Sequence, residues 1–140
     1  MAAQYIWSRV EGQTVNGCKD DLTKTSTALT QGRLVGKDGD GYVVHATTGV
    51  KVLGIAMESK SSSDATTAPI LIDYVKRSDI LRAKVDAGTV SQTTEGELVD
   101  IHANGGLDVG ASTNDDAYVL RRGVYASDAE ILVTLQNTVF

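Results

Sequence analysis

The sequence predicts an all-β fold, a single-domain barrel or sandwich, from three observations. Apolar and polar residues alternate with a period of two in short runs. These runs are separated by turns rich in Gly, Asp, Asn, Ser and Thr, while helical periodicity is scarce. A chain of 140 residues with 41% hydrophobic and 22% charged residues is also the size of one compact domain.

Ten short segments have the alternation expected of strands. They are residues 4–10, 33–37, 42–46, 52–58, 70–76, 81–85, 97–102, 107–109, 117–121 and 130–135. Two of the turns between them, residues 38–41 and 104–106, contain glycines that supply the positive φ of a tight hairpin. Each of these two turns is predicted to join its neighbouring strands into a hairpin.

Helical structure is expected in two places at most. Residues 20–28 and residues 78–83 could each form a helical turn, the second with Ser78 as its N-cap. Residues 59–68 are polar and poor in apolar side chains, so they are expected to form a surface loop.

Part of the chain repeats. Residues 30–35, Thr-Gln-Gly-Arg-Leu-Val, recur as Thr-Glu-Gly-Glu-Leu-Val at residues 94–99, an offset of 64 residues from 30 to 94. The same offset pairs Gly41 with Gly105 and Val43 with Leu107. The pattern indicates a body over residues 30–140 with an internal duplication, residues 30–58 and 94–123, preceded by an arm and loop over residues 1–29. Any β-meander with glycine turns would also look self-similar, and both explanations stay open.

Charge and hydropathy argue against nucleic-acid and membrane partners. The formal net charge is -5, and the dibasic pairs at residues 76–77 and 121–122 are too small to make a nucleic-acid surface. No apolar run is long enough for a membrane span, and the N-terminus lacks the pattern of a signal peptide. We therefore expect synthesis in a cytoplasm, with no nucleic-acid or membrane partner. The only cysteine, Cys18, has no partner for a disulfide within the chain.

Motifs for metal binding or catalysis are missing. Residues 37–43, Lys-Asp-Gly-Asp-Gly-Tyr-Val, resemble the middle of an EF-hand loop, but the first and twelfth ligand positions would fall on Gly36 and Thr47, so a hairpin turn is expected. His45 and His102 have no ligand cluster around them. No nucleophile elbow or phosphate-binding glycine motif is present, and adjacent carboxylates such as Asp115 and Asp116 are usually solvated. We predict no catalytic residue, no metal site and no cofactor.

Residues 30–58 carry a family resemblance. They contain Gly-Arg-Leu-Val, then Gly-Tyr-Val-Val, Ala-Thr-Thr-Gly and Gly-Ile-Ala, a run that resembles the head decoration (capsid cement) proteins of tailed bacteriophages. The apolar stretches at residues 70–75 and 131–135 extend the similarity. The resemblance implies a β-barrel or β-tulip-like body. It also implies a structural, non-enzymatic virion protein that binds the capsid exterior as a homotrimer and cements neighbouring subunits of the major capsid protein.

The N-terminal segment contains the candidate capsid contacts. Tyr5, Ile6, Trp7 and Arg9 concentrate aromatic, apolar and basic side chains in a chain with only 5% aromatic residues. An extended arm could bind a neighbouring sheet edge through main-chain hydrogen bonds. In that case deletion of residues 1–8 leaves a folded body that no longer occupies capsids. Alternatively, the segment completes the barrel and Trp7 lies in the core.

Two other classes of function stay open. A carbohydrate- or host-surface-binding module of a phage virion would expose aromatic side chains, whereas Tyr42, Tyr74, Tyr118 and Tyr125 lie in patterns typical of wall residues. A small hydrolase would gather a nucleophile and a base in one pocket, which the linear sequence does not reveal.

Overall fold

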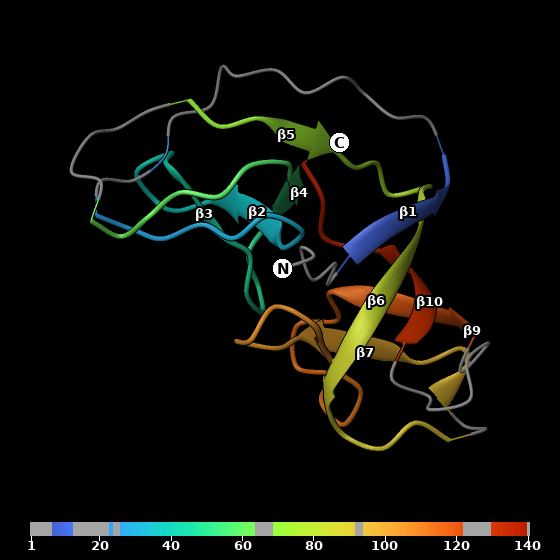
Figure 1. Ribbon diagram of the computed structural model, residues 1–140. Helices are drawn as coiled ribbons and strands as arrows, with labels where there is room; N and C mark the ends of the chain where they lie inside the picture. Colours follow the sequence, from blue (N-terminus) through green and yellow to red (C-terminus); the bar gives the residue numbers. More distant parts are fainter. Residues whose placement is uncertain are drawn as a thin grey trace.

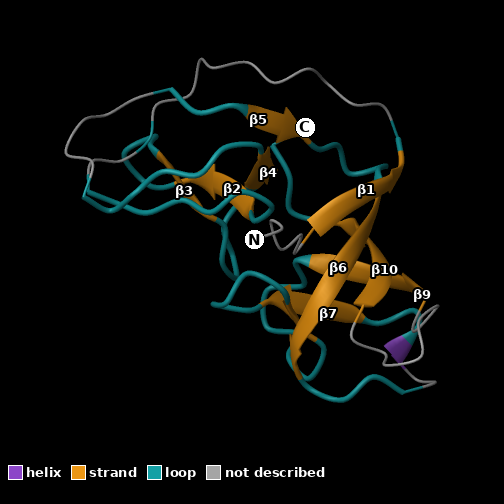
Figure 2. Ribbon diagram, viewed as in Figure 1, coloured by secondary structure: helices purple, strands orange, loops and turns teal. Residues whose placement is uncertain are grey.

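The computed structural model of the chain describes residues 7–12, 23, 26–63, 69–91, 94–121 and 130–139. The described residues form strands and no α-helix, which confirms the all-β prediction; the short helical piece in Figure 2 is a 3₁₀ turn at Thr94. The strands are β1 (Trp7–Glu11), β2 (Leu34–Lys37), β3 (Val43–His45), β4 (Val52–Ala56), β5 (Ile72–Tyr74), β6 (Ile80–Ala87), β7 (Leu98–Ile101), β8 (Leu107–Asp108), β9 (Ala117–Arg121) and β10 (Glu130–Leu135). Each overlaps one of the ten predicted segments.

Five strands close into a barrel, which confirms the barrel prediction (Figure 1). Their order is β6-β10-β9-β7-β8, and a parallel pairing between β8 and β6 completes the circuit. β1 is an additional strand, antiparallel to β6 on its other side. The barrel closes around side chains that alternate along its strands, because every second residue of a strand points inward. The buried residues include Leu81, Ala83, Val99, Leu107, Val119, Ile131 and Val133.

The remaining strands form an antiparallel sheet beside the barrel, in the order β3-β2-β4-β5 (Figure 1). The two faces of this sheet contribute to different cores. One face builds a small core of its own from Leu29, Val35, Val43, Leu53, Ala56, Ile70 and Ile72. The other face, with Leu34, Val52 and Ile55, joins the core of the barrel. Since both faces are buried, the sheet and the barrel form one body.

The two predicted copies have the same topology. The order β3-β2-β4-β5 recurs as β8-β7-β9-β10, and we call these the N-terminal unit (β2–β5) and the C-terminal unit (β7–β10). Their first hairpins have the same register at the predicted offset of 64 residues. In the N-terminal unit, Gly36 lies opposite Val44 and Lys37 opposite Val43. In the C-terminal unit, Asp100 lies opposite Asp108 and Ile101 opposite Leu107. The correspondence extends to a fourth strand, which the sequence comparison did not include.

The hairpin turns of the two units are also alike. In the N-terminal unit, the Gly41 N–H donates to the Asp38 carbonyl over 3.1 Å, and in the C-terminal unit the Gly105 N–H donates to the His102 carbonyl over 2.9 Å. Gly41 and Gly105 both have positive φ, 86° and 102°. Both predicted hairpins are thus present, and they bend at the expected glycines.

Two expectations for local structure need correction. Residues 78–83 do not form a helical turn, because β6 begins at Ile80 and its pairing with β1 and β10 requires an extended backbone. The N-terminal segment is not a free extended arm over residues 7–11, since these residues form β1. Most of the other helical candidate, residues 20–28, lies outside the described residues, as does Cys18.

Candidate functional site

β1 places two of the predicted capsid contacts inside the body. The Trp7 side chain is 1% exposed, and its indole N–H donates to the Gly105 carbonyl over 2.6 Å. The Trp7 backbone N–H donates to the Gly32 carbonyl over 3.1 Å. Trp7 is therefore a core residue that contacts both units, and the interpretation of Trp7 as an exposed capsid anchor is wrong for the folded chain. Tyr5 and Ile6 lie outside the described residues.

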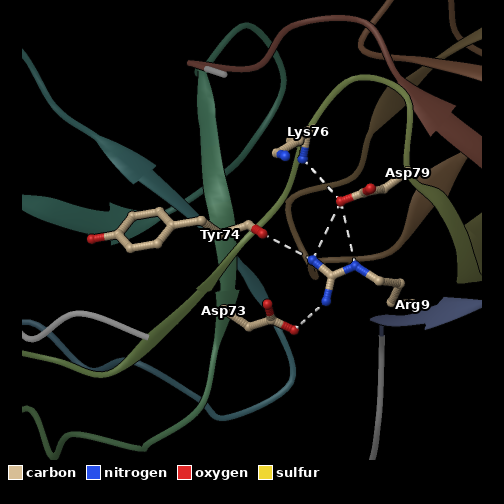
Figure 3. A network of polar contacts seen from close by, with 5 residues as sticks. All are labelled: Arg9, Asp73, Tyr74, Lys76 and Asp79. Atoms are coloured by element: carbon tan, nitrogen blue, oxygen red, sulfur yellow. Dashed lines mark hydrogen bonds and ion pairs between the residues drawn. The ribbon is translucent and has the colours of Figure 1, made fainter. Parts of the chain in front are cut away.

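Arg9, two residues farther along β1, is the centre of a buried ion-pair network (Figure 3). Its side chain is 8% exposed. Nη1 lies 2.7 Å from Asp73 Oδ2, Nη2 donates to the Tyr74 carbonyl over 2.8 Å, and Asp79 Oδ2 lies 3.3 Å from Nε and from Nη2. Asp79 Oδ2 also accepts the Lys76 backbone N–H over 3.0 Å. The guanidinium thus ties β1 to β5 and to the turn that leads into β6.

The electrostatics of this network keep Arg9 charged. Burial alone would lower the pKa of Arg9, but the hydrogen bond to Asp73 and the negative charges of Asp73 and Asp79 raise it above its ordinary value. A guanidinium suits this place because its planar fork donates in several directions at once. Since these donors bind the chain's own oxygens, Arg9 is not a free basic group for a capsid surface.

Two buried carboxylates organise the loop between β8 and β9. Asp100 accepts the backbone N–H groups of Thr113, Asn114 and Asp115, each over 2.9 Å. Asp116 accepts the N–H of Ile101 over 2.9 Å and that of Gly49, in the N-terminal unit, over 3.1 Å. The sequence suggested that the pair at residues 115–116 is solvated, but Asp116 is buried. Its carboxylate satisfies buried backbone donors and links the two units.

The two histidines also accept hydrogen bonds from the backbone. His45 Nε2 accepts the Thr30 N–H over 2.8 Å, and His102 Nδ1 accepts the Asn104 N–H over 3.0 Å. Residues 37–43, which resemble the middle of an EF-hand loop, form a hairpin turn. Within it, Asp38 Oδ1 accepts the N–H groups of Asp40 and Tyr42. Within the described part of the chain, no three His, Cys, Asp or Glu side chains gather into a group able to hold a metal ion.

His45 predicts a pH-dependent stability. Burial, and then the positive charge of Arg33, lower the pKa of His45 from 6.5 to about 4. The unfolded chain therefore takes up this proton first as the pH falls, so the stability that neutral His45 contributes is complete above pH 6.5 and is lost toward pH 4. The full shift corresponds to about 3 kcal/mol, and we expect about 1–2 kcal/mol because His45 is only half-buried.

Urea unfolding at pH 7.5 and at pH 4.5 measures this effect. His45→Gln keeps a side-chain acceptor without a titrating group, so it should lose most of the difference between the two pH values. His102→Gln is the matched control and should retain the wild-type difference. An unchanged pH dependence in His45→Gln would show that other groups cause it.

Three cavities border the described strands, one of them an open hollow of about 500 Å³ between the end of β1 and the start of β6. The other two lie beside β4 and beside β7. One, of about 200 Å³, separates β1 from β4 and is lined by residues that include Trp7, Arg9, Ile55, Met57 and Asp73. The other is an open groove of about 460 Å³ beside β7, lined by Glu97, Leu98, Val109, Gly110, Ala111, Ser112 and Asp115. Among the described residues, neither is lined by a His or Cys side chain, so no described histidine lies beside Ser112 in the groove.

The groove lies next to an exposed apolar pair that sequence reasoning missed. Leu98 on β7 stands opposite Tyr118 on β9, and the two side chains are 39% and 37% exposed. The alternation in each strand correctly predicted one buried face, with Val99 and Ala117 inside the barrel. The alternation could not show that Leu98 and Tyr118 would stand opposite each other, because the pairing of residues across two strands is a tertiary property.

The described residues include no helix that is long and apolar enough to cross a membrane. Comparison of the chain with protein-family models, with curated proteins and with solved structures finds no match.

Proposed function

We propose that the chain is a non-enzymatic structural module that binds the outside of a bacteriophage capsid, as a homotrimer on the major capsid protein. The observation that carries this proposal is the use of its buried polar side chains. Arg9, Asp79, Asp100 and Asp116 all bind the chain's own backbone or one another. Such an arrangement favours a rigid body that acts through its surface over a catalyst that needs free reactive groups.

The family resemblance supports the same proposal. The resembling segment, residues 30–58, covers three strands of the N-terminal unit, and its glycines stand at turns and close contacts. At Gly54, for example, an added Cβ would lie 2.2 Å from the Asp73 carbonyl, so the approach of β4 to β5 requires glycine. The glycine-containing motif of residues 30–58 therefore reflects the packing of a β-scaffold.

Binding of this kind would stabilise a capsid by mass action. A ligand that binds only the assembled lattice lowers the free energy of that state relative to separated subunits. A trimer would add to the effect, since its second and third contacts form at a high effective concentration after the first. The body is compatible with this role because its strands pair into a closed barrel and a packed antiparallel sheet.

Purified virions of the phage that encodes the chain provide the test. We expect the protein in intact virions and electron cryomicroscopy density for it above the capsid shell. In solution, light scattering should give three times the chain mass of 14.8 kDa. Absence from virions, or density inside the shell only, would contradict the capsid role, and a monomer on capsids would contradict the trimer alone.

A further inference from the structure

The two units carry equivalent rows of residues on one face. In the N-terminal unit, Leu34, Ile55 and Asp73 stand side by side on β2, β4 and β5. In the C-terminal unit, the same places in the register belong to Leu98, Tyr118 and Thr134 on β7, β9 and β10. We call these the N-terminal row and the C-terminal row.

In the N-terminal unit, β1 and the core of the barrel together cover the row. Leu34 and Ile55 are buried in the same cluster as Trp7, and Ile55 lines a cavity together with Trp7. The Trp7 N–H donates to the carbonyl of Gly32, and Arg9 forms its 2.7 Å ion pair with Asp73 at the far end of the row. An extended segment with a large apolar residue and a basic residue two positions later thus completes this face.

The C-terminal row has a different environment. Leu98 and Tyr118 are 39% and 37% exposed, although they occupy the places of buried Leu34 and Ile55. The groove of about 460 Å³ runs beside them, and Glu97 and Asp115 give it an acidic lining. Gly96, which corresponds to Gly32, has the same left-handed backbone, with φ of 84° against 91°. The backbone that receives β1 in one unit is therefore repeated in the other.

We infer that the C-terminal row is a docking site for an extended segment of another protein, one that carries a large apolar side chain and a basic residue. The apolar side chain covers Leu98 and Tyr118, as Trp7 covers Leu34 and Ile55. The basic residue faces the acidic groove at Glu97 and Asp115, which lies at the Leu98 end of the row. Thr134 stands in the place of Asp73 at the other end and offers no charge, so the segment crosses the row in the opposite direction to β1. A main-chain N–H of the segment donates to the Gly96 carbonyl, as that of Trp7 does to Gly32.

A synthetic peptide with the sequence of residues 4–12 is the probe, because β1 is the segment that binds the equivalent face. It is titrated into the ¹⁵N-labelled full chain and followed by NMR. We expect shift changes at the amides of Gly96, Leu98 and Tyr118, and binding that is weaker by about tenfold or more in Tyr118→Ser. Val139→Ser is the matched control, since Val139 is 48% exposed at another place, and it should bind like the wild type. A peptide with both Trp7→Ser and Arg9→Glu should not bind.

Three results would overturn the inference, two from the peptide titration and one from the oligomeric state. The first is binding that Tyr118→Ser and Leu98→Ser both leave unchanged, in variants whose circular dichroism shows a native fold. The second is no shift on the C-terminal row at millimolar peptide. If these substitutions also convert an oligomer into monomers, the face is instead a contact between copies of the chain. The peptide experiment does not depend on the capsid role, so the absence of the protein from virions would leave its result unaffected.

Discussion

Replacement of Trp7 by alanine is expected to lower the free energy of unfolding by about 3–5 kcal/mol, the range for removal of a large buried aromatic side chain. The indole is 1% exposed and donates to the Gly105 carbonyl, so the substitution leaves both a cavity and an unpaired buried acceptor. Folded proteins of this size have about 5–15 kcal/mol in total, so the variant should lose a large fraction of its stability. Urea unfolding followed by circular dichroism measures the change, because Trp7 is the only tryptophan and fluorescence disappears with it.

Val10 offers the matched control for Trp7. Val10 lies in the same strand but is 50% exposed, and Val10→Ala should change the stability by less than about 0.5 kcal/mol. Deletion of residues 1–8 removes Trp7 as well and should destabilise the body, contrary to the expectation of a dispensable arm. A fully stable Trp7→Ala variant that fails to bind capsids would restore the arm interpretation.

Replacement of Arg9 by methionine is expected to cost about 3–5 kcal/mol, since it leaves the buried carboxylate of Asp79 and the partly buried carboxylate of Asp73 without their counter-charge. Methionine retains much of the volume of the arginine stem, so the loss reports mainly on charge and hydrogen bonds. The measurement is urea unfolding in 0.1 M and in 1 M salt. The cost should persist at high salt, because buried pairs are screened far less than surface pairs.

Arg77→Met is the control for Arg9. Arg77 is exposed and donates to the Gln136 carbonyl over 2.7 Å, so its loss should cost less than about 1 kcal/mol. A cost for Arg9→Met that is equally small, or that disappears in 1 M salt, would mean that the network behaves like a surface ion pair.

The molecule contains two units of like topology but unequal surroundings. Both have the same strand order and hairpin register, but only the C-terminal unit combines with β6 into the described closed barrel. β1 lies between β6 and the N-terminal unit, and its side chains complete the row on that unit. The equivalent row on the C-terminal unit has exposed apolar residues, and no described strand covers it, which is why it is the candidate for an external partner.

The amino-acid sequence by itself determined the strands, the two hairpins and the all-β class. These depend on local rules: a two-residue alternation marks a strand with one buried face, and a glycine at positive φ marks a tight turn. The repeat at an offset of 64 residues likewise indicated two similar β-motifs, because Gly41 and Gly105 occupy equivalent turns.

Only the tertiary structure decided what the side chains contact. In the sequence, Trp7 and Arg9 were candidates for an interface. In the structure, Trp7 is a core residue bonded to Gly105, and Arg9 is paired with Asp73 and Asp79. Tyr118 had the pattern of a wall residue, yet its side chain is 37% exposed and stands beside exposed Leu98 through the register of β7 and β9. Burial depends on partners that are distant in the chain, and a local pattern does not contain them.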